Sequence, residues 1–199
     1  MRRLPRRWLR EAVTLAVTAL VLLTTRSVVA DHYQVPSGSM EPTVAIGDHI
    51  LVNKLAYGVR VPFTDAYLAS FGGPAHGDVV VLASPVDGET LLKRVVAVPG
   101  DTVQVRGGQL VLNGRPIPIE AGATGPEERI GEGVHAVRLT GGGGPDLPAT
   151  RIPDDRYLVM GDNRGDSYDG RLFGLVEGDA IRGRAVAIVY RDGLTWLAL

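Results

Sequence analysis

The stretch VQVRGGQLVLNGRPI, Val103–Ile117, carries the clearest secondary-structure signal in the chain. Its short apolar runs are interrupted by Gly107-Gly108 and then by Asn113-Gly114. Glycine and asparagine supply the positive φ angles that two-residue hairpin turns require. The stretch therefore predicts antiparallel strands joined by tight turns.

Other short, valine-rich segments follow the same pattern, each bounded by Pro-Gly, Gly-Gly, Asn-Gly or Asp-Gly pairs. Runs of this length between turn residues are typical of strands in an antiparallel sheet. We therefore expect a mostly β protein, with an antiparallel β-sheet or barrel-like domain. The predicted strands are 77–84, 89–98, 101–105, 109–113, 156–162 and 182–191.

Residues 114–150 depart from this pattern. The segment 120–150 shows little hydrophobic periodicity and is rich in glycine, with four consecutive glycines at 141–144. Segments without a helix or strand period are typical of loops. We expect residues 114–150 to form a peripheral excursion that ends in a flexible loop.

Composition excludes several function classes. The chain has 199 residues, no cysteine and a formal net charge of −1. Five arginines lie within residues 1–10, so residues 11–199 carry a net charge of −6. This acidic body argues against a nucleic-acid partner, because phosphate binding needs clustered Lys and Arg side chains. Without cysteine there is no thiolate chemistry, and the histidines show no metal-ligand spacing, so we expect no metal and no cofactor.

The N-terminal residues predict a membrane anchor. After the basic residues 1–10, residues 12–30 are apolar or weakly polar apart from Arg26. As a helix they would span about 28 Å, enough for the hydrocarbon core of a bilayer. We predict a transmembrane helix over residues 11–30 with the basic N-terminus in the cytoplasm. A cleavable signal peptide ending near Ala30 is the alternative, because small side chains precede that position.

The segment QVPSGSMEPT, Gln34–Thr43, places two serines around a glycine and between two prolines. A serine hydroxyl becomes a good nucleophile only when a neighbouring base takes its proton. Histidine is the usual base, but none of the histidines lies in a recognisable catalytic motif. The Gly-x-Ser-x-Gly motif is also absent from this segment. On these residues alone, a connecting turn explains the segment equally well.

Lys93 is the other candidate base. In the predicted strand 89–98 it shares a face with Leu91, Val95 and Ala97. An apolar environment disfavours the ammonium form and lowers the pKa of a lysine. An edge-strand lysine whose amino group reaches solvent is the simpler alternative.

These segments, taken together and in order, resemble the type I bacterial signal peptidases, a family of membrane-bound Ser/Lys endopeptidases. The similarity runs from the apolar anchor through YQVPSGSMEPT, HGDVVVL and LLKRVVAVPGD to MGDNRGDSYDGRLFG. By this resemblance Ser39 is the nucleophile and Lys93 is the general base. The hydroxyl of Ser37 and the backbone N–H of Ser39 would form the oxyanion hole.

The last of these motifs supplies supporting residues. The resemblance implies that Ser167 orients the lysine and that Asp169 and Arg171 form a polar pair. We expect Arg171 to pair with Asp162 or Asp169 and so hold the loop. A plain polar loop or an acidic, calcium-like cluster is the alternative, although the spacing does not fit an EF-hand.

Three positions in this motif depart from the family pattern. Gly165-Asp166 replaces the more usual Asp-Asn, and Gly170 replaces a common serine. Fewer polar side chains would then support Lys93. The assignments of nucleophile and base do not depend on these positions.

The resemblance implies removal of signal peptides from exported preproteins at the outer face of the cytoplasmic membrane. Small residues would be required at the first and third positions before the cut. Residues 31–199 would form an extracytoplasmic catalytic domain whose partners are signal peptides and membrane lipid, with no nucleic acid and no metal. Two alternatives remain open, a membrane-anchored β domain that binds without catalysis and a Ser/Lys protease that cleaves itself.

Overall fold

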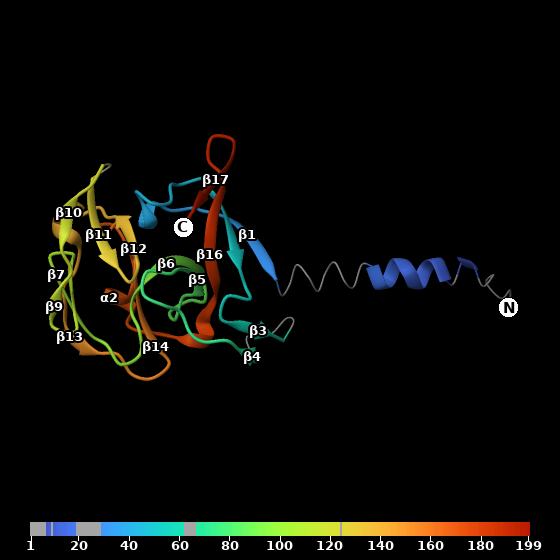
Figure 1. Cartoon of the computed structure of the whole chain (residues 1–199), viewed down its shortest axis with the longest axis horizontal. Helices are drawn as coiled ribbons and strands as arrows, with labels where there is room; N and C mark the ends of the chain where they lie inside the picture. The colour runs from blue at the N-terminus through green and yellow to red at the C-terminus, as the bar shows by residue number, and fades with distance from the viewer. Residues whose placement is uncertain (1–6, 9, 19–28, 62–66, 124) are drawn as a thin grey trace.

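Antiparallel β-sheets make up most of the structure (Figure 1). The computed structural model describes residues 7–8, 10–18, 29–61, 67–123 and 125–199. The predicted mostly β fold is confirmed, because all the predicted strands are present with ends that differ by a few residues at most.

The largest sheet in the described part of the chain has eight strands in the order β1-β2-β16-β5-β6-β14-β15, with β17 also paired to β16. The long strand β16 pairs with β5 through its first residues and with β2 through its later ones, and the register shifts along it. The sheet curves into a half-barrel (Figure 1). Its strands are β1 (Ala30–Gln34), β2 (His49–Asn53), β5 (Val79–Ala83), β6 (Thr90–Ala97), β14 (Arg156–Met160), β15 (Val176–Glu177), β16 (Ile181–Tyr190) and β17 (Leu194–Ala198).

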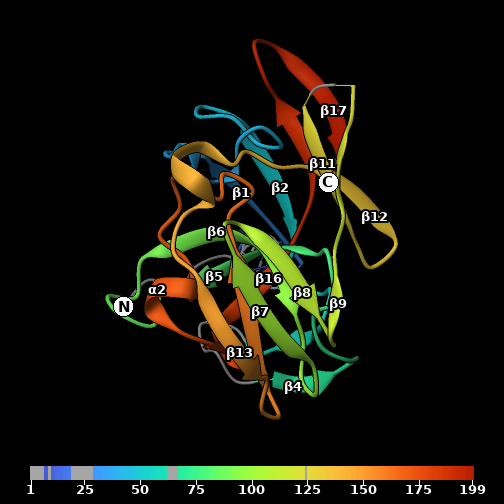
Figure 2. The ribbon, with the colours of Figure 1, turned by 90° about the vertical axis from the view of Figure 1, so that its left-hand side faces the viewer.

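The glycine-punctuated hairpins form a second sheet, in the order β13-β7-β8-β9. The turn between β7 and β8 is Gly107-Gly108, with φ angles of 53° and 79°, and Asn113-Gly114 follows β8 with φ angles of 53° and 77°. Both predicted positive-φ turns are therefore confirmed. Figure 2 shows this sheet turned toward the viewer. Its strands are β7 (Thr102–Arg106), β8 (Gln109–Leu112), β9 (Arg115–Pro116) and β13 (Leu147–Arg151).

The segment 120–150 is more regular than its sequence predicts. Strands β10 (Ile119–Ala121), β11 (Pro126–Ile130) and β12 (Gly133–Ala136) form a third sheet, and β13 joins β7. Buried positions here include Glu128 and His135 as well as Ile130 and Val137. The sequence did not indicate these strands because two of the buried positions are polar, and a polar side chain leaves no hydrophobic period.

The four-glycine run is partly packed, because Gly143 is buried whereas Gly141 and Gly142 are exposed. It forms the short 3-10 segment η2 (Thr140–Gly143) and lies against the β7–β8 turn. A Cβ atom at Gly143 would come within 2.4 Å of the Gly107 carbonyl oxygen. The expected flexible loop is therefore held by close backbone contact with a neighbouring turn.

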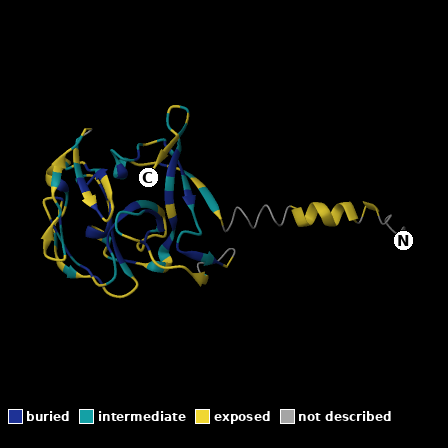
Figure 3. Ribbon diagram, in the orientation of Figure 1, coloured by how far each residue is buried: buried dark blue, intermediate teal, exposed yellow. Residues whose placement is uncertain are grey.

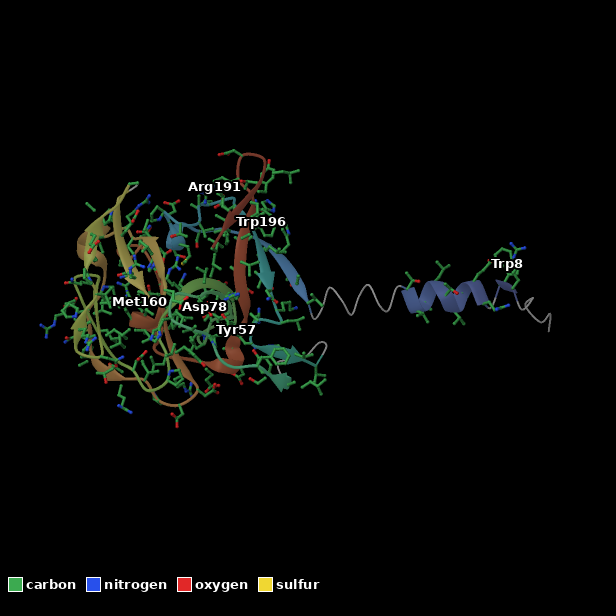
Figure 4. The ribbon with its side chains drawn as sticks, in the orientation of Figure 1. Trp8, Tyr57, Asp78, Met160, Arg191 and Trp196 are labelled. Atoms are coloured by element: carbon green, nitrogen blue, oxygen red, sulfur yellow. The ribbon has the colours of Figure 1, made fainter. Side chains whose placement is uncertain are left out.

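Three apolar clusters are buried among the described residues, and two of them pack the half-barrel against the nucleophile-bearing segment and the second sheet. One contains Met40 and Val44 together with side chains of β2, β5 and β16. The other lies between β6 and β14 and the second sheet and includes Met160, which Figure 4 places within the body of the domain. Figure 3 shows the buried residues concentrated on the strands between these layers. The remaining elements are β3 (Gly58–Arg60), β4 (Tyr67–Ser70), η1 (Gly38–Met40), η3 (Gly178–Ala180) and α2 (Gly170–Phe173).

The predicted transmembrane segment 11–30 is only partly described. Residues 10–18 are helical and exposed, and the preceding Trp8 is 64% exposed (Figure 4). Residues 19–28 lie outside the described part of the chain. Among the residues that the structure describes, no helix has both the length and the apolar character to cross a bilayer.

Candidate active site

Ser39 lies in the 3-10 turn η1, between β1 and β2. The next residue, Met40, is fully buried in the first apolar cluster and anchors one side of the turn. Asn163 holds the other side, because its backbone N–H donates to Ser39 O at 3.1 Å and its side-chain Nδ2 donates to Gly38 O at 3.1 Å. The position of the Ser39 hydroxyl is thus set by packing and by two hydrogen bonds.

Lys93 reaches this hydroxyl from β6. Its Nζ donates to Ser39 Oγ at 2.7 Å and to Leu92 O at 3.0 Å. The side chain is buried, and burial lowers the pKa of Lys93 from 10.5 to about 8, although the charges of Asp169 and Asp162 oppose that change. A neutral amine that can accept a proton is therefore well populated near pH 8.

Ser37 lies two positions before Ser39 in the chain. Its Oγ lies 3.4 Å from Ser39 Oγ, and either hydroxyl could donate. Ser37 precedes η1 in extended conformation, which turns its side chain toward Ser39. Two hydroxyls and one buried amine therefore meet at a single point.

Asp169 and Arg171 form one of the supporting pairs expected from sequence. Arg171 donates through Nε to Asp169 Oδ1 at 2.8 Å and through Nη2 to Asp169 Oδ2 at 2.8 Å. Asp169 also accepts from the Gly161 N–H at 3.0 Å. Burial alone would raise the pKa of Asp169, but the hydrogen bonds and charge of Arg171 hold it below its usual value. The pair is buried and charged, and it fixes the backbone at Gly161.

Ser167 is buried beside the same backbone. It lowers the pKa of Asp169, yet its hydroxyl is not aligned for a hydrogen bond to any described residue. A Cβ atom at Gly161 would meet Ser167 Oγ and Ser39 O, each at 2.3 Å. Ser167 thus lies against Gly161, which is also close to the Ser39 carbonyl. The expected hydrogen bond from Ser167 to Lys93 is not present among the described residues.

Asp162 pairs with Arg94 rather than with Arg171. Arg94 donates through Nε to Asp162 Oδ1 at 2.8 Å and through Nη2 to Asp162 Oδ2 at 2.7 Å. Thr43 Oγ1 also donates to Asp162 Oδ2. Of the two partners left open for Arg171, the structure has Asp169, and the sequence analysis missed Arg94 although it directly follows Lys93.

A second group that the sequence analysis missed joins β11 and β12 to the loop. Glu128 is buried and accepts from Arg164 Nη1 at 3.2 Å, and His135 Nε2 lies 3.1 Å from Glu128 Oε1. Burial and the nearby charge of Arg94 lower the pKa of His135 to about 4. Of this group only Arg164 lies inside the last motif, between Asp162 and Asp166, and nothing in the sequence indicates that its partner is Glu128.

Gly165 is one of the departures from the family pattern, and a larger residue would not fit at this position. A Cβ atom at this position would fall 1.6 Å from the carbonyl oxygen of Thr140. Arg171 Nη1 donates to the Gly143 carbonyl at 2.6 Å, so the glycine-rich turn packs on the loop from the same side. The loop is supported by close backbone contact where the family more often has polar side chains.

The histidines are bonded away from Ser39. His49 Nδ1 lies 2.7 Å from His32 Nε2, and His76 Nε2 lies 2.6 Å from Asp101 Oδ2. Within the described ranges, no three His, Cys, Asp or Glu side chains are grouped so that they could hold a metal ion. Lys93 is the basic group that contacts the Ser39 hydroxyl.

A small pocket of about 180 Å³ opens beside Ser39 and Lys93. It is bounded by the end of β1, the η1 turn and the first half of β6, and most of its lining is apolar. An apolar cavity of about 150 Å³ holds benzene, so a pocket of this volume has room for an apolar side chain. The lining includes Val35, Ile50, Val81 and Leu91.

Comparison with known proteins places this chain in a family. The chain is 37% identical to the signal peptidase I of Pseudomonas aeruginosa, with 84% of this chain and 67% of that protein covered. It is 34% identical to the signal peptidase I of Bacillus amyloliquefaciens, with 81% and 75% covered. A crystal structure of a signal peptidase I from Enterococcus faecalis aligns with 58% of this chain and 98% of that one, at 27% identity and a TM-score of 0.44. Residues 6–190 match the family model described as signal peptidase, peptidase S26, and the chain therefore belongs to this family of signal peptidases.

Proposed function

We propose that Ser39 and Lys93 are the catalytic dyad of this signal-peptide-cleaving serine endopeptidase. The observation that carries the assignment is the 2.7 Å hydrogen bond between Lys93 Nζ and Ser39 Oγ inside a buried setting. Each of the four histidines has a hydrogen-bond partner other than Ser39 or Lys93. Family membership argues against the non-catalytic alternative, and no observation favours self-cleavage.

The dyad accounts for each proton in the reaction. Neutral Lys93 takes the hydroxyl proton as Ser39 Oγ attacks the carbonyl carbon before the scissile bond. The carbonyl π electrons move to oxygen, where the Ser37 hydroxyl and the Ser39 N–H stabilise the oxyanion. The Lys93 ammonium group then donates its proton to the leaving amine as the C–N bond breaks. Water releases the acyl group by the same steps, again with Lys93 as base.

The apolar lining of the pocket beside Ser39 supports a preference for uncharged residues before the cut. An unpaired charge placed there would lose its hydration, which costs several kcal/mol. Family membership is the basis for proposing peptides with small residues at the first and third positions before the cut as substrates.

Five residues behind the dyad are proposed to support it. Asp169 with Arg171 holds Gly161, and Asp162 with Arg94 holds the strand that carries Lys93. Ser167 fills the space between this backbone and the nucleophile turn. These contacts restrict the relative motion of Ser39 and Lys93, and no cofactor or metal takes part in the proposed chemistry.

The proposed topology places residues 1–10 in the cytoplasm, residues 11–30 in the membrane and residues 31–199 outside. It is supported by the arginines of the N-terminus and by exposed apolar side chains on the described helical residues, including Val13, Leu15 and Val17. Protease added to spheroplasts should digest the β domain and spare the extreme N-terminus. Recovery of a soluble protein that begins at Asp31 would contradict this topology and favour a cleaved signal peptide.

The dyad is tested by incubating the purified protein in detergent with a preprotein that carries Ala-x-Ala before the cut, and by mapping the cleaved bond. Ser39→Ala should be inactive, and Lys93→Arg should be as inactive as Lys93→Ala, because a guanidinium does not give up its proton. Lys54→Arg is the matched control and should keep full activity. Substantial activity in Lys93→Arg, or dependence on His49 or His76, would overturn the assignment.

A further inference from the structure

A second, larger cavity lies along the nucleophile segment. It has a volume of about 960 Å³ and opens between the β11–β12 hairpin and the half-barrel. The small pocket is lined by residues up to Met40, whereas Pro42 and Thr43 line the larger groove. The segment from Ser37 to Thr43 therefore borders both cavities, with Ser39 on the side of the small pocket.

An ion pair marks the border between Ser39 and this groove. Glu41 Oε2 lies 2.6 Å from Arg138 Nη1, and both side chains remain partly exposed. Glu41 also donates its N–H to Gly38 O, and Arg138 donates its N–H to Asp162 O. The pair thus sits on backbone that is tied to the active site, and a peptide that extends from Ser39 toward the groove passes it.

The charges around the groove do not cancel. Its two arginines and His76 each have an acidic partner, namely Arg94 with Asp162, Arg184 with Asp78 and His76 with Asp101. His135 adds no positive charge near pH 7, because burial and the charge of Arg94 lower its pKa to about 4. Glu127 and Glu132 also line the groove, and neither forms an ion pair with any residue that the structure describes. Two carboxylates without partners give this surface a net negative charge.

We propose that this groove binds the segment of the preprotein that follows the scissile bond, and that Glu127 and Glu132 favour a basic over an acidic side chain there. The inference rests on the proposed function, because a peptide held in the small pocket and attacked by Ser39 must continue past the nucleophile. Thr43 is four residue positions after Ser39, which corresponds to at most about 14 Å of chain. The preference should therefore act on roughly the second to fifth residues after the cut.

The test uses two peptides that are identical up to the cut, with Ala-x-Ala before it, and that carry Lys or Glu at the third and fourth positions after it. The Lys peptide should have a kcat/KM about two- to fivefold higher, as expected for partly exposed charges. Added salt should reduce this ratio, because it screens exposed charges.

A matched pair of variants separates the groove from the overall charge. Glu127→Gln with Glu132→Gln should bring the two peptides to equal kcat/KM. Asp154→Asn with Glu177→Gln removes the same charge from residues that do not line the groove, and it should keep the preference.

Equal cleavage of both peptides by the unaltered protein would overturn the inference, as would a preference that survives in the Glu127 and Glu132 double variant. Failure of the unaltered protein to cut either peptide at the mapped bond would instead overturn the proposed function. The two failures are therefore distinguishable in the same assay.

Discussion

Lys93 and Arg94 are neighbours on β6, and their side chains lie in different surroundings on its two faces. Both are buried, at 3% and 6% exposure. Arg94 makes two hydrogen bonds to Asp162 and a third to the Gly77 carbonyl. Lys93 bonds only to the Ser39 hydroxyl and one backbone carbonyl among the described residues. One buried cation is fully paired with a carboxylate, and the other has none in contact.

The site needs one basic group that can lose its proton and another that stays charged, and these two residues differ in that respect. A general base must be able to lose its proton, so a carboxylate in contact with Lys93 would hold the proton on and raise its pKa. A supporting residue must stay charged and rigid, which two hydrogen bonds from a guanidinium provide. Asp162 and Asp169 act on Lys93 only through their charge, and burial outweighs them.

Breaking the Arg94–Asp162 ion pair should have the largest effect on stability. Asp162→Asn leaves the Arg94 guanidinium buried without its counter-charge, and it should lower the free energy of unfolding by about 3–5 kcal/mol. Urea unfolding in detergent measures this change. Glu177→Gln, which removes the partner of Arg156 on the surface, is the control and should cost less than about 1 kcal/mol. Similar losses in both variants would remove the distinction between paired and exposed arginines.

Replacing Lys93, which has no carboxylate in contact among the described residues, should instead raise the free energy of unfolding. Lowering the pKa of Lys93 from 10.5 to about 8 corresponds to a cost of about 3 kcal/mol at pH 7. Lys93→Met should therefore be inactive but up to about 3 kcal/mol more stable at pH 7. The unfolded chain binds the extra proton between pH 8 and 10.5, so the gain should disappear as the pH rises through that range. Lys54→Met serves as the control, and a destabilised Lys93→Met at pH 7 would contradict the argument.

The same lowered pKa predicts the pH dependence of cleavage. The value of kcat/KM should rise with pH and level off above about pH 8, where Lys93 is neutral. Well below that value it should fall about tenfold per pH unit, reaching roughly a hundredfold at pH 6. Rates measured from pH 6 to 9 on one peptide test this, and a flat profile would rule out Lys93 as the base.

Asn163 should show the smallest of these effects. Asn163→Ala removes the hydrogen bond to the Gly38 carbonyl and loosens the turn that carries Ser39. One lost hydrogen bond of about 1–1.5 kcal/mol predicts a roughly tenfold lower kcat. KM should change little, because Asn163 is proposed to position the nucleophile and not to touch the substrate.

Gln109→Ala, at an exposed position in β8, is the control for Asn163→Ala and should leave both constants unchanged. A higher KM with unchanged kcat in Asn163→Ala would assign this side chain to substrate binding. The conservative change Asn163→Gln should recover part of the lost kcat if the amide donor is what matters.

Much of the fold follows from short-range pattern. Valine-rich runs between glycine turns identified four of the eight half-barrel strands, namely β5, β6, β14 and β16, and missed the other four. Gly107-Gly108 and Asn113-Gly114 identified two hairpin turns. These signals are local, because a positive φ angle depends on the residue that adopts it. The order of the motifs likewise pointed to Ser39 and Lys93, which the structure brings within a hydrogen bond although they are 54 positions apart.

Residue patterns and motifs were enough to predict the β class, the turns and the candidate nucleophile and base, since each depends on neighbouring residues or on a motif. Only the tertiary structure decided the partners of the buried charges. Arg94 meets Asp162 across 68 positions, and Arg164 meets Glu128 across 36. Ion pairs of this kind leave no period in the sequence, because they join residues that are adjacent only after the sheets have packed. The same packing buries Lys93, and burial is the physical reason that its pKa is low enough for a base.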